Sequence, residues 1–253
     1  MAKRFMGEQN NCQWDGAALK RACLARLAGA PTDQVYSASH IPTRGDHDLN
    51  GGEVFDLGDE GRGDDEGGRG EDITDSESTA RAPQTEPLKV PKPAAVLVPI
   101  IERAHGLSVL LTQRHKNLNS HGGQISFPGG KVDASDPSPL DTALRESYEE
   151  VGIRREHVEV LGYCDDYQTV TGFRIVPVVG LVSSETELVA EPGEVALIFE
   201  VPFDFLMCAE NHRRDSLVWQ GKRRHYFAMP YETHYIWGAT AGILKNLHER
   251  LFI

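Results

Sequence analysis

Residues 128–153 read PGGKVDASDPSPLDTALRESYEEVGI, a glycine-containing loop followed by a short segment with three closely spaced glutamates. Ser138 and Pro139 predict the start of a helix, because Ser caps free backbone N–H groups and Pro is favoured at the first helical position. Gly152 suits a left-handed cap at the other end. We therefore expect a helix over Pro139–Val151.

Three glutamates of this helix point to its chemistry. Glu146 and Glu150 are i and i+4 neighbours, and Glu149 lies beside them at i+3. Like charges at these spacings repel and cost roughly 0.2–0.5 kcal/mol per pair. Glutamate pairs on helices are most often solvated, but here a glycine loop precedes them and Arg145 can hold Glu149 by an ion pair. A divalent cation would compensate the repulsion, since hard cations prefer oxygen ligands.

The helix also has an apolar side at helical spacing, which we expect to pack against the core. Its members are Leu140, Ala143, Leu144, Tyr148 and Val151. The carboxylates lie largely outside this stripe, at an edge that the preceding loop can reach.

The pattern from Gly130 to Ile153 resembles the signature of the Nudix hydrolase family. That signature is Gly, five residues, Glu, seven residues and then Arg-Glu-U-x-Glu-Glu-x-Gly-U, where U is bulky and apolar. The chain departs from it in three places: Asp136 replaces the first Glu, eight residues precede Arg145, and Ser147 replaces an apolar residue. None of these departures removes a carboxylate of the cluster. The resemblance implies an α/β fold, the Nudix-type α/β/α sandwich with a mixed central sheet.

The upstream segment narrows the resemblance within the family. Residues 110–130 read LLTQRHKNLNSHGGQISFPGG. They look like the motif of the coenzyme A diphosphatase branch, roughly Leu-Leu-Thr-x-Arg-Ser followed by His-x-Gly-x-Val/Ile-x-Phe-Pro-Gly-Gly, with His115 where Ser is usual. Asp133 and Asp136 fit the Gly-Gly-x-x-Asp-x-x-Asp pattern and the longer spacing of this branch. The resemblance covers about residues 92–252.

The carboxylates are the candidate metal ligands, with Mg²⁺ or Mn²⁺ as the expected cofactor. A bound cation lowers the pKa of a coordinated water and draws charge from phosphoryl oxygens. Glu146 and Glu150 are the first candidates, and Gly130 could add a backbone carbonyl. Glu149 is a ligand, the general base or the partner of Arg145. The expected catalytic residues are thus Glu149, Arg145 and Glu146.

Five further residues are candidates for binding substrate. Arg114, His115 and Lys116 form a basic cluster at a predicted strand end, which meets either phosphate group of coenzyme A or is merely solvated. His121 donates to a phosphate or caps a turn, and no second His at ligand spacing supports it as a metal ligand. Glu194 adds a loop carboxylate or is an exposed turn residue.

The activity implied by the resemblance is hydrolysis of coenzyme A or acyl-CoA to (acyl-)4′-phosphopantetheine and adenosine 3′,5′-bisphosphate. Two alternatives stay open: a Nudix hydrolase of another nucleoside diphosphate derivative such as ADP-ribose or a dinucleotide, and a non-catalytic Nudix-fold binding module. The expected partner is a small-molecule nucleotide of the coenzyme A type, with no nucleic acid and no membrane. A homodimer is left open. No apolar run approaches the roughly 20 residues of a membrane span.

The net charge of −12 over 253 residues is unevenly distributed. Between Arg44 and Glu77 there are 13 Asp and Glu against 3 Arg. The rest of the chain is nearly neutral, so its overall acidity says little about the substrate and argues only weakly against nucleic acid. We expect an N-terminal helical segment over 1–35, an acidic Gly-rich disordered linker or insertion over 36–90, and the Nudix domain over 91–253.

Residues 16–29 predict a short amphipathic helix whose stripe of Leu19, Cys23 and Leu27 docks on the domain. A mitochondrial presequence is the rival interpretation, but acidic residues nearby argue against it. The four cysteines show no paired ligand spacing. We therefore expect free thiols in a reducing compartment, and the expected location is cytoplasmic.

The remaining elements follow from apolar periodicity and turn residues. The expected strands are 94–102, 107–114, 124–127, 158–163 and 173–182. A short strand or turn (196–200), a short helix (203–208), a hairpin (217–220 with 225–229) and a closing helix (238–251) follow. Tyr231, Tyr235 and Trp237 belong to the core or line the substrate pocket, and we expect the core.

Overall fold

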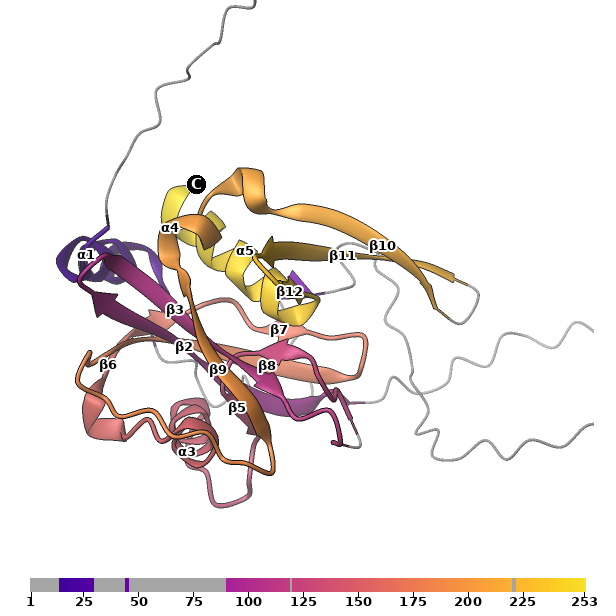
Figure 1. Cartoon of the computed structure of the whole chain (residues 1–253), viewed down its shortest axis with the longest axis horizontal. Coiled ribbons are helices and arrows are strands. Elements are labelled where there is room, and N and C mark those ends of the chain that lie inside the picture. The colour runs from indigo at the N-terminus through magenta and orange to yellow at the C-terminus, as the bar shows by residue number, and fades with distance from the viewer. Residues whose placement is uncertain (1–13, 30–43, 46–89, 119, 220–221) are drawn as a thin grey trace, which may run out of the picture.

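The computed structural model describes residues 14–29, 44–45, 90–118, 120–219 and 222–253. Its three main helices are α1 (Gly16–Arg26), α3 (Pro139–Val151) and α5 (Ala239–Phe252). A large sheet lies between α3 on one face and α1 with α5 on the other (Figure 1). This arrangement confirms the predicted α/β sandwich.

The large sheet has nine strands and is mixed. They are β1 (Arg44–Gly45), β2 (Lys92–Arg103), β3 (Gly106–Arg114), β4 (Ile125–Ser126), β5 (Gly129–Lys131), β6 (Val158–Tyr163), β7 (Tyr167–Gln168), β8 (Phe173–Val182) and β9 (Val195–Pro202). β2 runs parallel to β8 and antiparallel to β3. β2 is therefore hydrogen-bonded along both edges. Its apolar run is buried on both faces, as expected for a central strand.

The glycine loop is itself part of this sheet. Residues 124–127 were expected to form one strand, but β4 ends at Ser126 and the chain then bends into β5. β5 pairs antiparallel with β2, with Gly130 opposite Ala95. This pairing fixes the backbone of Gly130 beside α3, which contacts β5.

Helix α3 has the predicted bounds and caps. The Ser138 side chain accepts from the Asp141 N–H, and Gly152 has a left-handed φ of 76°. The prediction that Tyr148 belongs to the buried stripe is wrong, since this residue is 57% exposed. Ser147 takes the buried place, and its hydroxyl donates to the Ala143 carbonyl at 2.6 Å. The reason is the 100° turn per residue, which places Ser147 nearer the centre of the stripe than Tyr148.

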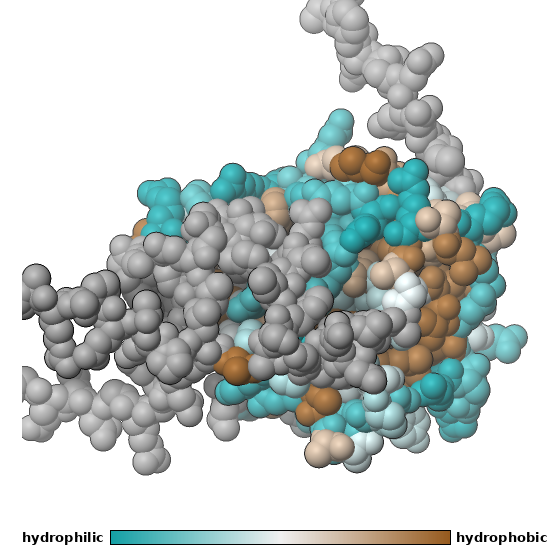
Figure 2. Space-filling view, turned by 180° about the vertical axis from the view of Figure 1, so that it is seen from behind, coloured by the Kyte–Doolittle hydropathy of each residue, from teal (hydrophilic) through white to brown (hydrophobic). Residues whose placement is uncertain are grey.

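The opposite face is covered by α1 and α5. Asp15 caps α1 by accepting from the Ala18 N–H. Leu19 and Cys23 are completely buried in the core that α5 shares, which confirms the predicted docking of this helix. Most large apolar side chains lie in the two cores. On the face seen in Figure 2, hydrophilic residues predominate among the coloured atoms and hydrophobic ones gather mainly along one side.

A second, three-stranded antiparallel sheet lies beside the first (Figure 1). It consists of β10 (Arg213–Trp219), β11 (Lys222–Tyr231) and β12 (His234–Trp237). Only a shorter β10–β11 hairpin was expected, and the turn at residues 220–221 lies outside the described residues. The ring of His234 stacks on Phe199 of β9 at 3.9 Å, and Lys245 of α5 lies 4.9 Å from the Phe227 ring centroid. These contacts join the second sheet to both the first sheet and α5.

Several smaller elements complete the fold. β9 pairs along most of β3, so residues 196–200 belong to a full strand rather than a turn. The short helices are α4 (Phe203–Leu206), η2 (Arg155–His157) and η3 (Ala209–Asn211). Cys23, Cys164 and Cys208 carry free thiols, and Cys12 lies outside the described residues. In the described part of the chain, none of the helices combines the length and apolarity needed to cross a membrane.

Two residues of the predicted linker take part in the sheet. Arg44–Gly45 forms β1, which pairs in parallel with Tyr167–Gln168. This contact was not expected for a disordered segment. Apart from β1 and Val90, the predicted linker at 36–90 lies outside the described residues, as do 1–13 and 30–35 of the N-terminal segment.

Candidate active site

A pocket of about 690 Å³ opens between α3, the glycine strand β5 and the second sheet. Six of the predicted site residues line it: Arg114, His121, Gly130, Glu146, Glu150 and Glu194. Segments far apart in the sequence therefore meet at one cavity. The size lies within the range of small-molecule sites.

Glu146 and Glu150 reach the pocket from α3, while Glu194 comes from the loop before β9. Glu146 lies so close to Gly130 that a Cβ at position 130 would overlap its carboxylate. Glu150 is only 3% exposed. Its carboxylate accepts from the Gly129 N–H at 3.1 Å and from Arg114 at 3.3 Å.

The carboxylates in the pocket disfavour one another's charge. Burial raises the pKa of Glu150 to about 7, against the hydrogen bond from Gly129 and the charge of Arg114. The charges of Glu146 and Glu194 raise this pKa further. Burial likewise raises the pKa of Glu146, and Glu149 and Glu194 add to that shift while Arg145 opposes it. The site is therefore short of positive charge.

These residues fit a hard divalent cation. Their donors are carboxylate oxygens, and a cation would relieve the repulsion among Glu146, Glu150 and Glu194. In the described ranges, however, no three His, Cys, Asp or Glu side chains are already grouped to hold a metal ion. Mg²⁺ needs only one or two protein carboxylates when substrate phosphates and water complete its shell. The arrangement thus suits an ion whose remaining ligands are water or, when substrate is bound, phosphate oxygens.

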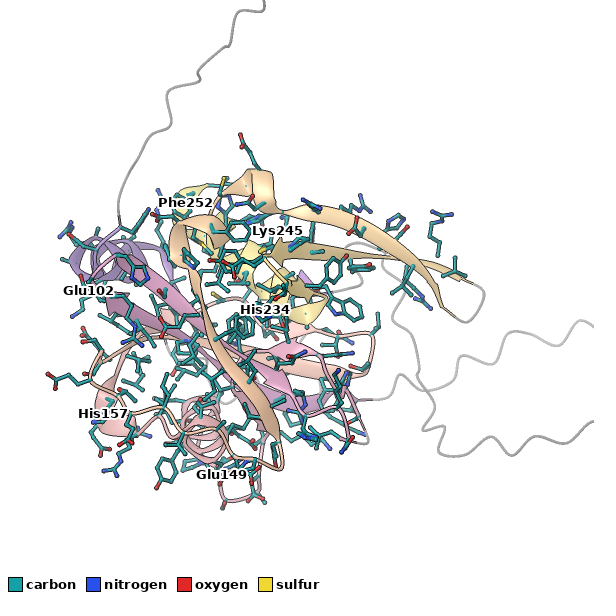
Figure 3. All side chains as sticks on the ribbon, in the orientation of Figure 1. Glu102, Glu149, His157, His234, Lys245 and Phe252 are labelled. Atoms are coloured by element: carbon teal, nitrogen blue, oxygen red, sulfur yellow. The ribbon has the colours of Figure 1, made fainter. Side chains whose placement is uncertain are left out.

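Glu149 does not line the pocket. Its side chain is 56% exposed and pairs with Arg145 at 3.0 Å. Figure 3 shows it on α3 at the outer edge of the molecule. Helical geometry explains this, because Glu149 lies roughly opposite the buried stripe while Glu150 lies beside it. Its ion pair matches the role of partner to Arg145.

Arg145 joins the loop before α3 to the carboxylates. Its guanidinium donates to Asp136 at 3.0 and 2.9 Å and to the Lys131 carbonyl at 3.2 Å. It also pairs with Glu146 at 2.9 Å. The Arg145 hydrogen bonds lower the pKa of Asp136 to about 2, against a smaller effect of burial. Arg145 is therefore a positioning residue that orients Glu146.

The basic cluster divides at the end of β3. Arg114 lines the pocket, whereas His115 and Lys116 do not. The chain leaves the strand there, and the His115 ring accepts from the Asn117 N–H at 3.3 Å. His121 lines the pocket at a positive φ of 57° and its ring bonds to the Gln124 side chain at 3.0 Å. That contact fits both roles considered for His121.

Several pocket residues were not predicted. They are Lys131, Thr169, Thr171, Phe173, Leu217, Arg224, His225 and Tyr226. Trp237 also lines the pocket and Tyr235 is 42% exposed, so the expectation that both belong to the core is wrong. The Arg-Arg-His-Tyr run at 223–226 was a local signal, because arginine binds phosphate groups and aromatic rings stack on bases.

Part of this sequence is similar to the sequences of known proteins. Residues 91–217, half of the chain, match the NUDIX domain family. An "Uncharacterized Nudix hydrolase NudL" of Citrobacter koseri is 41% identical over 154 residues, which are 61% of this chain and 80% of that protein. The NudL protein of Pectobacterium atrosepticum is 39% identical over 166 residues, 65% of this chain and 85% of its own.

Among solved structures, a C. elegans Ap4A hydrolase in a binary complex shows 19% identity and a TM-score of 0.39, covering 44% of this chain and 80% of that one. The family match and the two bacterial relatives settle the class. The chain belongs to the Nudix family and is a hydrolase that acts on pyrophosphate bonds. Members of this family generally use divalent metal ions.

Proposed function

We propose that the protein hydrolyses the diphosphate bond of coenzyme A or an acyl-CoA. The observation that carries this proposal is the place of the 110–130 segment, whose motif resembles the coenzyme A diphosphatase branch. Five residues of that motif line the same pocket as the carboxylates: Arg114, His121, Ile125, Phe127 and Gly130. Residues that mark the branch are therefore in a position to contact the substrate.

Glu146 and Glu150 are the residues we propose to hold Mg²⁺ or Mn²⁺, with Glu194 and the Gly130 carbonyl close by. The bound ion would activate a water and neutralise phosphoryl charge. Arg145 orients Glu146, and the Gly129 N–H orients Glu150. Arg114 places a permanent positive charge beside the phosphoryl oxygens.

Water then attacks phosphorus and the P–O–P bridge breaks. One water is consumed, and the products are (acyl-)4′-phosphopantetheine and adenosine 3′,5′-bisphosphate. Burial raises the pKa of Glu150 and so favours its protonated form. A cation in the site would favour the charged carboxylate instead, because the opposite charges attract. The charge of Glu150 and the binding of the cation therefore depend on each other.

We also propose that residues 91–253 form the catalytic domain, with α1 packed on it as an added helix. Support comes from the buried contacts of Leu19 and Cys23 with the α5 core. The acidic segment within 36–90 is proposed as a linker or insertion that β1 ties to the sheet edge.

Product analysis tests the proposed activity. The purified full-length chain is incubated with Mg²⁺ or Mn²⁺ and, in separate reactions, coenzyme A, ADP-ribose and a diadenosine polyphosphate, and the products are identified by mass. We expect 4′-phosphopantetheine and adenosine 3′,5′-bisphosphate from coenzyme A, and no products when EDTA removes the metal. Products from ADP-ribose formed much faster than those from coenzyme A would refute the proposal.

A further inference from the structure

The two sides of the pocket differ in charge. The acidic side is built from α3 and the Glu194 loop, while the facing wall comes from the second sheet and the start of α5. Among the residues that the structure describes, three Lys or Arg line the cavity: Arg114, Lys131 and Arg224. Arg114 pairs with Glu150, and the Lys131 ammonium lies 5.8 Å from the Phe173 ring centroid. Arg224 is the cation of the facing wall.

Strand register places Arg224 within a continuous face of the second sheet. Arg224 pairs with Leu217, Tyr226 pairs with Asp215, and Trp237 pairs with Ala228. Side chains alternate along a strand and directly paired residues share a face, so Arg224, Tyr226 and Trp237 point to the same side. All three line the pocket, together with Leu217.

The aromatic part of this face is held in place. The rings of Tyr226 and Trp237 meet edge to face, with centroids 5.2 Å apart and an interplanar angle of 66°. The Tyr226 hydroxyl lies 3.3 Å from that of Tyr235, which donates to Asp215 at 2.7 Å. Rings fixed in this way offer a preformed apolar surface to a flat ligand.

Arg224 is only 8% exposed although it borders the cavity. A guanidinium stays charged under all ordinary conditions, and its planar fork matches two oxygens of a phosphate. A buried cation next to fixed aromatic rings is therefore suited to a nucleotide that carries a phosphate at some distance from the bond being cleaved.

We infer that Arg224, with Tyr226 and Trp237, recognises a phosphate monoester on the ribose of the substrate and the base beside it. This inference rests on the proposed function, because coenzyme A carries such a 3′-phosphate in addition to its diphosphate. Arg224 thereby takes the role in binding this phosphate that the sequence had suggested for His115 and Lys116, neither of which lines the pocket. Arg224, Tyr226 and Trp237 lie outside the family match at 91–217, as expected of residues that select a substrate rather than perform the shared chemistry.

The test compares coenzyme A with 3′-dephospho-coenzyme A, which differs only in that phosphate. We expect the full-length protein to prefer coenzyme A by about 10- to 100-fold in kcat/KM, the range of a charge-assisted hydrogen bond. Arg224→Gln should reduce this preference to within about threefold, and Arg224→Lys should restore part of it. The matched control is Arg223→Gln, because Arg223 is the exposed neighbour on the other face of β11 and contacts Ser216. This control should keep the preference.

A merely structural role of Arg224 predicts equal losses for both substrates and an unchanged preference, which would overturn the inference. No preference in the unmodified protein would overturn it too, while hydrolysis of coenzyme A would still support the proposed function. If coenzyme A is not hydrolysed, the proposed function fails, and calorimetric binding of adenosine 3′,5′-bisphosphate against AMP tests the subsite separately. Tighter binding of the bisphosphate that Arg224→Gln abolishes supports the subsite, and equal binding of both nucleotides refutes it.

Discussion

The carboxylate of Glu146 lies directly against the backbone of Gly130, with no room for a Cβ between them. β5 holds Gly130 from the sheet side by its pairing with Ala95. Arg145 holds Glu146 from the helix side at 2.9 Å. The loop and the helix thus meet at a contact that only glycine permits, at the acidic side of the pocket.

Replacement of Gly130 by alanine should therefore displace Glu146. We expect Gly130→Ala to lower kcat/KM by about 10- to 100-fold, the usual effect of disturbing a group that supports a metal ligand. Steady-state kinetics with coenzyme A measures the loss. Gly29→Ala is the control, because an added Cβ there meets nothing within 4 Å. Equal kinetics of the two variants would show that the contact is unimportant.

Glu149 and Glu150 are sequence neighbours with different environments, which makes them a matched pair. Glu150→Gln should lower kcat by more than about 100-fold with the fold intact, since it removes a buried charge from the proposed metal site. Glu149→Gln should change kcat by less than about fivefold, because an exposed ion pair contributes at most about 1 kcal/mol. Circular dichroism checks the fold of both variants. Near-normal turnover by correctly folded Glu150→Gln would refute the metal assignment.

Metal binding should be visible without any substrate. A ligand at about 100 times its Kd stabilises by about 2.7 kcal/mol, which corresponds to a rise in Tm of roughly 5–10 °C for a protein of this size. We expect Mg²⁺ or Mn²⁺ to raise the Tm of the unmodified protein, and Glu146→Gln to remove most of that rise. Differential scanning calorimetry in EDTA and in excess metal gives the comparison. An identical rise in both proteins would exclude Glu146 as a ligand.

Asp136 should stabilise the protein in a pH-dependent way. Its side chain is 5% exposed, and the hydrogen bonds from Arg145 lower its pKa from 3.8 to about 2. A lowered pKa in the folded state means that the contribution is complete above the unfolded pKa and is lost as the pH falls toward 2. We expect Asp136→Asn to cost about 1–2 kcal/mol at pH 7.

Urea unfolding at several pH values measures this difference. The two proteins should converge in stability between about pH 4 and pH 2, where Asp136 becomes protonated. A difference that stays constant down to pH 2 would assign the loss to packing rather than to charge.

The sequence predicts helix α3 well because the information is local. Ser138 and Gly152 define both ends through bonds to residues a few positions away. The sequence does not predict that Glu150 is buried and Glu149 exposed, because this difference depends on which side of the helix the sheet covers. Tyr148 was misplaced for the same reason: an apolar residue at the margin of a stripe is buried only if a neighbour covers it.

Only a short hairpin of the second sheet was predicted, because much of β10 and β11 is polar. β10 and β11 are rich in arginine, so neither shows the apolar alternation that marks a half-buried strand. Arg224 joins the pocket only through the register of this sheet, which folds over residues more than 50 positions away along the chain, such as Thr169 and Phe173. No spacing in the sequence predicts that Arg224 lines the same pocket as Thr169 and Phe173.

A competition experiment tests the central claim most directly. Equimolar coenzyme A, ADP-ribose and diadenosine tetraphosphate are mixed with the full-length protein and Mg²⁺, and the depletion of each is followed by mass spectrometry. The ratio of depletion rates gives the ratio of kcat/KM values. We predict that coenzyme A disappears first, with 4′-phosphopantetheine and adenosine 3′,5′-bisphosphate formed in equal amounts. Depletion of ADP-ribose or diadenosine tetraphosphate ahead of coenzyme A would contradict the proposed function.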